Sequence, residues 1–283
     1  MYAITGITGQ VGSALGQQLL AAGLPVRAVV RDAAKGHAWA ARGADVALAD
    51  VNDAAALTQA FTGAEAVFVL LPPTFDPSDG FPEARRAIEA LREALATARP
   101  GRVVALSTIG AQSTRPNLLN QLGIMEQELG TLDLPVAFLR AAWFIENTLW
   151  DVESARADGR IASLLQPVER PVPMVACADI SALAAELLLQ TWNGRRVVEL
   201  QGPAPISPAD IAASFSRLLG TQVDAHAVPR ETWEAMFLSQ GMKNPVPRMR
   251  MLDGFNEGWI AFEGTARKGI VTLDDAIAGL LAR

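Results

Sequence analysis

The sequence contains very few of the side chains on which most metal and thiol chemistry depends. Among its 283 residues there is one cysteine, Cys177, and there are two histidines, His37 and His226. A single cysteine cannot form an intrachain disulfide or a cysteine-based zinc cluster, and neither histidine has a second histidine at ligand spacing. These counts exclude most metal and thiol chemistry, and we expect no metal site.

Tyrosine and lysine are almost as rare. The only tyrosine is Tyr2, which falls in an apolar run at the start of the chain, and the lysines are Lys35, Lys243 and Lys268. No tyrosine precedes a lysine by a few residues. Chemistry that relies on a phenol activated by a nearby ammonium group is therefore excluded.

Excess positive charge and long apolar runs are also missing. The chain has 24 Lys and Arg against 30 Asp and Glu, a net charge of −6, which argues against a nucleic-acid-binding surface. The longest apolar run near the middle, residues 66–71, is far shorter than the ~20 residues that cross a membrane. The first residues lack the basic and long apolar parts of a secretory signal. We expect a cytoplasmic protein without nucleic-acid or membrane partners.

What the chain does contain is an alternation of two apolar patterns over its first half. Short apolar runs are separated by stretches with helical periodicity. Strands that are apolar throughout indicate a parallel sheet with helices on both faces, so residues 1–150 are predicted to form a doubly wound α/β domain of the Rossmann type. The expected strands are 2–5, 26–31, 44–49, 66–71, 103–107 and 135–140, and the expected helices are 11–22, 33–42, 53–61, 82–98 and 119–132.

The second half is less regular. Its glycines and prolines predict a loop-rich segment at 151–178, and Asp179 is expected to cap a helix that ends at Gln190. This helix and a strand at 197–200 are expected to return to the first domain, within residues 179–200. A small, mostly helical cap is predicted to contain 151–178 and 201–283, with helices at 208–219, 231–240 and 273–282. The last of these helices is a candidate for packing on the main domain.

A glycine-rich turn follows the first expected strand. Residues 5–12 read T-G-x-x-G-x-x-G and open the first helix. Small residues at this position permit a tight turn and a close backbone approach to a pyrophosphate, whose charge the helix N-terminus favours. The turn therefore predicts dinucleotide binding.

The end of the second strand bears on which dinucleotide is bound. Arg31 and Lys35 favour the 2′-phosphate of NADP(H), whereas Asp32 would favour NAD(H) unless it caps the next helix. We expect NADP(H), with NAD(H) as the alternative; a set of solvated surface charges would look the same. Loops after the third, fourth and fifth strands are expected to complete the cleft, although each is also an ordinary strand exit. The cofactor-binding residues predicted in this way are Thr5, Gly6, Thr8, Gly9, Gln10, Val11, Gly12, Arg31, Lys35, Asp50, Leu71, Pro72, Ser107 and Thr108.

Several segments together resemble the NmrA-like branch of the atypical short-chain dehydrogenases/reductases. This branch includes NADPH-dependent quinone and triphenylmethane-dye reductases as well as non-catalytic NADP-sensing regulators. The resemblance extends over nearly the whole chain and implies a nicotinamide cofactor. The matching segments are residues 5–12, 30–32 with Lys35, Ser107 with Thr108, 126–128, Leu139 with Arg140, 144–147, 172–179 and 272–275.

Two positions depart from this branch. Leu122 stands where the branch usually has a lysine or histidine, and Ala141 replaces a common proline. The first departure removes a polar contact to the nicotinamide ribose. Because the tyrosine–lysine pair is missing as well, sugar-epimerase and conventional alcohol-dehydrogenase activities are not expected.

Aromatic residues follow the sixth strand, where an acceptor would approach the nicotinamide. Trp143 and Phe144 lie there, and the resemblance implies that Asn147 faces the cleft. Trp233 and Phe237 stand at helical spacing in the cap. All five are candidate substrate residues, although the aromatics would serve equally well as core. Asn147 and Ser107 are the candidates for a catalytic role.

These observations predict an NAD(P)H-dependent oxidoreductase that transfers hydride to an apolar or aromatic acceptor, such as a quinone or a dye. Such an acceptor is electrophilic enough to need no positioned acid, so positioning and exclusion of water would supply most of the catalysis. Two alternatives remain open: a non-catalytic NADP(H)-sensing regulator with a protein partner, and an imine or enone reductase of secondary metabolism. Both a monomer and a homodimer are compatible with the sequence.

Overall fold

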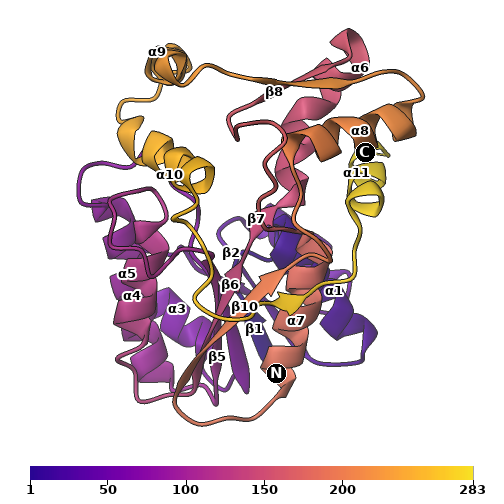
Figure 1. The fold of residues 1–283 in the computed structure, drawn as a ribbon. Coiled ribbons are helices and arrows are strands. Elements are labelled where there is room, and N and C mark those ends of the chain that lie inside the picture. The colour runs from indigo at the N-terminus through magenta and orange to yellow at the C-terminus, as the bar shows by residue number, and fades with distance from the viewer. Residues whose placement is uncertain (283) are drawn as a thin grey trace.

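A parallel sheet with helices on both faces forms the centre of the chain (Figure 1). The computed structural model describes residues 1–282. The sheet has eight strands in the order β12-β10-β6-β5-β4-β1-β2-β3, and every neighbouring pair is parallel. The strands are β1 (Tyr2–Ile4), β2 (Val26–Val30), β3 (Asp45–Leu48), β4 (Ala66–Leu70), β5 (Val103–Thr108), β6 (Val136–Ala141), β10 (Arg195–Gln201) and β12 (Arg267–Lys268).

Two apolar cores cover the two faces of this sheet. Tyr2 and Ile4 of β1 point into one core, and Ala3 between them points into the other. Because both faces are buried, the strands are apolar at every position rather than at alternate ones. The first core is covered by α1 (Gln10–Ala21), α2 (Ala33–Ala40) and α7 (Cys177–Leu189), and the second by α3 (Ala54–Phe61), α4 (Pro82–Ala98) and α5 (Asn120–Leu129).

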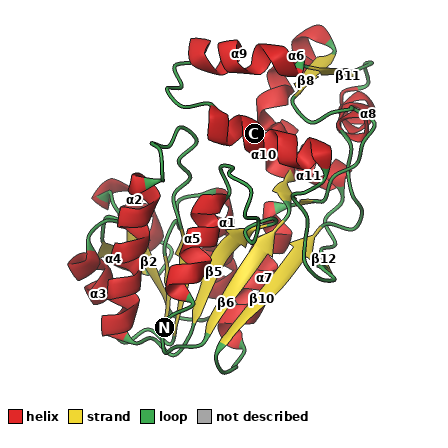
Figure 2. Cartoon of the chain, turned by 60° about the vertical axis from the view of Figure 1, so that its left-hand side comes forward, coloured by secondary structure: helices red, strands yellow, loops and turns green. Residues whose placement is uncertain are grey.

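A cap with its own apolar core lies over the carboxyl ends of the strands (Figure 2). Phe215, Trp233 and Phe237 are among the most deeply buried side chains of this core. Two small parallel sheets, β7–β9 and β8–β11, belong to the same region. The elements are β7 (Trp143–Phe144), η1 (Ile145–Asp151), α6 (Val152–Asp158), β8 (Arg160–Ser163), β9 (Met174–Val175), α8 (Pro208–Leu219), β11 (Asp224–Ala227), η2 (Arg230–Thr232), α9 (Trp233–Ser239), α10 (Val246–Glu257) and α11 (Leu273–Leu281).

The doubly wound α/β fold expected from the sequence is confirmed, and so are the strands and helices of its first half. Local capping explains two of the helix starts. Asp32 accepts a hydrogen bond from Ala34 N at 2.8 Å and caps α2, and Asp53 accepts one from Ala56 N at 2.9 Å and caps α3. These carboxylates satisfy N–H groups that a helix start otherwise leaves without partners.

The expected cap role of Asp179 is wrong. Helix α7 begins at Cys177, and the carboxylate of Asp179 instead accepts hydrogen bonds from Ile270 N at 3.0 Å and Val271 N at 3.1 Å. These partners are about 90 positions away along the chain, so the side chain ties the C-terminal segment to α7. A capping pattern cannot distinguish this long-range role from a local one.

Other differences concern the second half of the chain. The segment expected to be loop-rich contains α6, and α10 and β12 were not anticipated. The last helix has contacts in the cap: Ile277 and Leu280 are buried, and Asp274 Oδ1 accepts from Ser214 Oγ of α8 at 2.6 Å. Helix α10 has a proline in its first turn. A helix tolerates proline at this position, but in the sequence alone the proline suggested the end of a helix.

Within residues 1–282, no helix combines the length and the apolarity that a membrane span requires.

The carboxyl group of Asp151, at the end of η1, is largely withdrawn from water. Burial raises its pKa from 3.8 to about 6. Because the folded-state pKa is the higher one, ionisation opposes folding. This destabilisation is absent below about pH 4, grows as the pH rises to about 6, and is complete above that value.

We therefore expect Asp151→Asn to stabilise the protein at about pH 7.5, by on the order of 2 kcal/mol, and to have a clearly smaller effect at about pH 4.5. Urea unfolding at the two pH values measures the difference. Asp158→Asn, an exposed change on α6, is the control. An equal gain at both pH values would contradict the burial argument.

Candidate dinucleotide and acceptor site

The turn between β1 and α1 is so tight that only glycine fits at two of its positions. Gly6 has φ of 63°, in the left-handed region, and its carbonyl accepts from Gly9 N at 2.9 Å. A Cβ at Gly12 would overlap the Gly6 carbonyl oxygen and lie 2.8 Å from Ile7 Cα. The first turn of α1 therefore packs directly on the backbone of the loop, as a pyrophosphate-binding turn requires.

The N-terminus of α1 is open. No side chain caps this helix and its first turn holds no acidic residue, in contrast to α2 and α3, which Asp32 and Asp53 cap. Exposed N–H groups at the positive end of a helix dipole bind phosphate well. The residues present thus fit the pyrophosphate of a dinucleotide.

Neighbouring elements hold this turn in place. Thr5 Oγ1 donates to Phe68 O at 3.2 Å and accepts from Leu70 N at 2.9 Å, which ties the end of β1 to β4. Ser181 Oγ of α7 donates to Val11 O at 3.0 Å. Thr5 is buried and positions the loop, whereas Thr8, Gly9 and Gln10 are exposed at its surface.

Arg31 and Lys35 lie exposed at the carboxyl end of β2, as expected, while Asp32 is occupied by its cap of α2. This leaves the two cations as the charges available at that strand end. Asp50, after β3, accepts from Asn52 N at 2.9 Å and so shapes its own turn. All these positions lie at one edge of the sheet, because the carboxyl ends of parallel strands meet there.

The exits of β4 and β5 continue the same edge. Leu71 is buried and Pro72 is exposed. Ser107 is buried, and its Oγ donates to Glu126 Oε1 at 2.5 Å, so its proton is already engaged. Thr108 Oγ1 donates to Ile109 O at 3.2 Å. The carboxyl ends of five consecutive strands, β5, β4, β1, β2 and β3, thus bring the predicted cofactor residues to one end of the sheet.

Glu126, which accepts the hydrogen bond from Ser107, belongs to a charged network that sequence reasoning did not identify. Arg140 at the end of β6 donates to Glu126 through Nε at 2.9 Å and Nη2 at 2.7 Å, and to Glu263 through Nη1. Burial opposes the charge of Arg140, but its hydrogen bonds to Glu126 and Glu263 outweigh this and raise its pKa. Arg140 interrupts an otherwise apolar strand pattern, and this was the signal in the sequence that could have pointed to the network.

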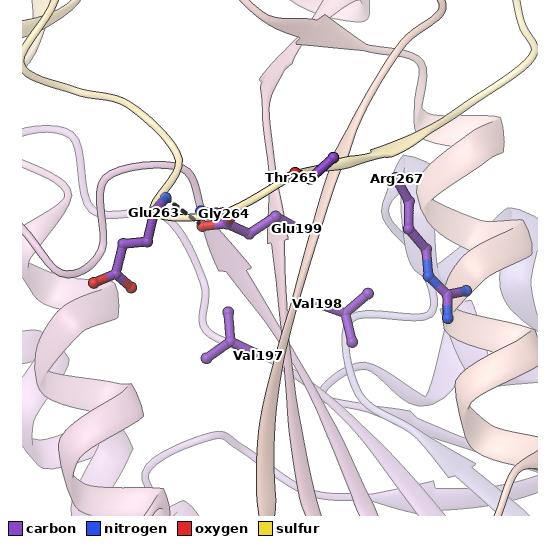
Figure 3. A pocket seen from close by; sticks show the side chains of 7 residues that line it. All are labelled: Val197, Val198, Glu199, Glu263, Gly264, Thr265 and Arg267. Atoms are coloured by element: carbon purple, nitrogen blue, oxygen red, sulfur yellow. Dashed lines mark hydrogen bonds between the residues drawn. The ribbon is translucent and has the colours of Figure 1, made fainter.

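Figure 3 shows Glu199 of β10 beside residues 263–264; Glu199 Oε1 also lies 3.7 Å from Arg140 Nη1. Glu199 accepts from the N–H groups of Glu263 and Gly264, both at 2.9 Å, and so fastens residues 263–264 to the sheet. A pocket of about 400 Å³ opens beside them, and β6, β5 and β4 separate it from the glycine turn at β1. The pocket is lined by Val197, Val198, Glu199, Glu263, Gly264, Thr265 and Arg267.

Tyr2, the tyrosine of the chain, lies at the amino ends of the strands, opposite to this site, and cannot transfer a proton there. Tyr2 begins β1, is 4% exposed, and donates to Glu65 Oε1 at 3.2 Å, whereas the site lies at the carboxyl ends of the strands. Burial and the charge of Glu65 raise its pKa. Leu122, on α5, packs against the apolar core on its side of the sheet.

The aromatic residues expected on the substrate side separate into two groups. Trp143 packs edge-on against Phe255 of α10, with ring centroids 5.1 Å apart, and Phe144 packs on the main core. Trp233 is 0% exposed, with Nε1 donating to Val228 O at 2.9 Å, and Phe237 is 1% exposed. The last two form the core of the cap and offer no surface to a substrate.

Asn147 remains exposed on η1, beside a second polar residue that the sequence did not single out. Glu146 Oε1 accepts from Cys177 N at 2.8 Å, so this carboxylate caps α7 from outside the helix. Its Oε2 is buried and has no hydrogen-bond partner in the described part of the chain. Within residues 1–282, no group of three or more histidine, cysteine, aspartate and glutamate side chains is arranged to hold a metal ion.

Together, the parallel sheet, the glycine turn and the open helix end define a dinucleotide-binding protein. The sequence pattern of the NAD(P)H-binding family matches residues 6–163, more than half of the chain. The chain belongs to this family.

Three characterised proteins illustrate the relationship. The chain is 27% identical to NAD(P)H azoreductase of Xenophilus azovorans, over all of its own length and 94% of that protein. It is 28% identical to quinone oxidoreductase 2 of Escherichia coli, over 88% of its own length and 85% of that protein. The structure of E. coli quinone oxidoreductase QOR2 with NADPH matches 99% of both chains, at 24% identity and a TM-score of 0.82.

The third is the Citrobacter sp. triphenylmethane reductase complexed with NADP(H). Its structure matches 99% of this chain and all of the other at 19% identity, with a TM-score of 0.82. Both structural matches extend over the cap as well as the sheet, so this chain and the two reductases of known structure share the arrangement of a sheet and a cap.

We expect Gly12→Ala to weaken NADPH binding by roughly tenfold or more, because the new Cβ displaces the loop from the phosphate position. Titration of NADPH fluorescence gives the affinity. Gly279→Ala is the control, since a Cβ there meets nothing within 4 Å.

Should Gly12→Ala fail to fold, Gly9→Ala is the milder test, with its Cβ 3.3 Å from the Gly6 carbonyl oxygen. Unchanged affinity in a folded Gly12→Ala protein would show that the turn does not hold the cofactor.

Proposed function

We propose that the protein is an NADPH-dependent oxidoreductase that reduces an apolar or aromatic acceptor, of the quinone or dye class, by hydride transfer. The observation that carries the proposal is the open glycine turn at a site that lacks the tyrosine–lysine pair. Relatives named for quinone and azo-compound reduction align with the chain over most of its length. A reduced nicotinamide, when bound, supplies the hydride.

The residues of the chain have the task of binding, orienting and excluding water. The turn of residues 5–12 and the end of α1 would hold the pyrophosphate, and Arg31 with Lys35 the 2′-phosphate. The exits of β5 and β7 would border the acceptor, with Trp143 and Asn147 nearest to the cap. Ser107 is not a free proton donor, because its hydroxyl hydrogen is bonded to Glu126.

Quinones and dyes suit such a site. Their conjugated systems accept hydride without a positioned acid, and the reduced product takes its proton from solvent. Catalysis then depends on holding the acceptor against the nicotinamide face in a dry cleft. All residues assigned to the site come from a single chain, so the proposed site is compatible with both a monomer and a homodimer. The cytoplasmic location stays a prediction.

We expect the protein to oxidise NADPH with 1,4-naphthoquinone or an azo dye well above the uncatalysed rate, measured by the loss of absorbance of NADPH. Because no phenol–ammonium pair titrates at the site, kcat should change little between about pH 6 and 9. Intact NADPH binding without turnover of any acceptor would contradict the proposal. A protein partner bound only in one redox state of the cofactor would then favour the sensor alternative.

We expect Arg31→Ala to weaken NADPH binding by roughly tenfold to a hundredfold and to change NADH binding by less than about twofold, because only NADPH carries the 2′-phosphate. Arg86→Ala, an exposed change on α4, is the control. Equal losses for both cofactors would show that Arg31 does not select NADPH.

A further inference from the structure

Arg248, in the first turn of α10, is half-buried, and within residues 1–282 no carboxylate pairs with its guanidinium. Arg102 and Arg140 are each held by a carboxylate at 2.7 Å. In residues 1–282, the polar contact of the Arg248 guanidinium is Met242 Sδ, 3.8 Å from Nη1. Partial burial lowers the pKa of Arg248. A guanidinium that is partly withdrawn from water is normally stabilised by an anionic partner.

Two aromatic rings orient the guanidinium. Its Cζ lies 4.7 Å from the ring centroid of Phe237, in α9, and 5.6 Å from that of Phe75, in the loop after β4. Such contacts are favourable, but they do not neutralise a charge. Phe75 is 49% exposed, so one of the two rings beside the cation is open to solvent.

Arg248 lies where the cap meets the exits of β4 and β5. Thr74, next to Phe75, accepts from Gln121 Nε2 of α5 at 3.1 Å. Pro247 O, next to Arg248, accepts from Leu118 N at 2.9 Å. Helix α10 lies beside the upper end of α5 in both views (Figures 1 and 2). The guanidinium is therefore on the cap side of the strand ends that the proposed acceptor would occupy.

The local electrostatics add to the positive potential. Helix α10 has no side-chain cap and no acidic residue in its first turn, where the helix dipole is positive. One carboxylate of the region, Asp76, is occupied by the N–H groups of Lys243, at 2.9 Å, and Asn244, at 2.7 Å. Those hydrogen bonds, of which the one from Asn244 has the larger effect, hold the pKa of Asp76 below its usual value.

We propose that Arg248 binds an anionic substituent, a sulfonate, carboxylate or phosphate group, on an aromatic acceptor whose ring lies against Phe75. The planar guanidinium matches the two oxygens of such a group. Arg248 is thus a specificity-determining residue that orients the acceptor and takes no part in the hydride step. This inference rests on the proposed function and narrows its substrate class.

The test compares 1,4-naphthoquinone with 1,4-naphthoquinone-2-sulfonate. In Arg248→Met, the ratio of kcat/KM for the sulfonated over the neutral quinone falls roughly tenfold, and Arg248→Lys restores part of it by keeping the charge. The control is Arg250→Met on the same helix, because Arg250 already has a partner, Asp253, at 3.5 Å. That variant keeps the ratio of the unmodified protein.

A binding titration separates this inference from the proposed function. Naphthalene-2-sulfonate is added to the NADP⁺-loaded protein and followed by tryptophan fluorescence; Arg248→Met weakens its binding roughly tenfold. If the protein reduces neither quinone, the proposed function is wrong and the titration still decides the role of Arg248.

Three results overturn the inference. The first is unchanged naphthalene-2-sulfonate binding in a folded Arg248→Met protein. The second is an equal loss of activity with both quinones together with a lower Tm, which assigns Arg248 to packing between the cap and the main domain. The third is weaker NADPH binding in the variant, which assigns the guanidinium to a phosphate of the cofactor.

Discussion

The geometry of the candidate site depends on how closely α1 approaches the turn that follows β1. With no side chain at Gly12, the helix packs on the Gly6 carbonyl, and no side chain caps its first N–H groups. Thr5 fixes the turn to β4, and Ser181 fixes the helix to α7. The glycine turn and the start of α1 are therefore held both by the sheet and by α7, which limits the ordering that ligand binding would require.

The polar groups at the acceptor end perform a different task. Ser107, Glu126 and Arg140 satisfy one another, and Glu199 fastens the segment that crosses the sheet edge. Tyr2 lies at the opposite edge. Side chains that transfer protons in other reductases are thus either absent here or committed to holding elements together. Such a site selects acceptors by their own electrophilicity and by fit, since it offers little acid catalysis.

Much of this could be predicted from the sequence because it is encoded locally. Buried parallel strands, helix caps such as Asp53 and a glycine turn each leave a short-range pattern, and the residues after the strands meet because the sheet is parallel. What could not be predicted depends on distant partners. Asp179 has the spacing of a cap but binds a backbone segment about 90 positions away.

The same limit applies to the aromatic residues. Trp233 and Phe237 have the spacing of a helix face, and only the packing of the cap shows that this face is its core. Arg248 gave no signal, because the lack of a carboxylate partner within residues 1–282 becomes visible only once its neighbours are placed. Sequence patterns identify which side chains share a face, but they do not tell which of those faces meets solvent.

The path of the chain determines how the two parts of the protein can behave. It leaves the sheet after β6, returns through α7 and β10, enters the cap again, comes back to the sheet edge as β12, and finishes in the cap as α11. Each crossing is a covalent tether, and the one at β12 is also hydrogen-bonded to β10. Because several separate segments join the cap to the sheet, a movement of the cap relative to the sheet would have to bend the chain at each of these crossings rather than at a single hinge.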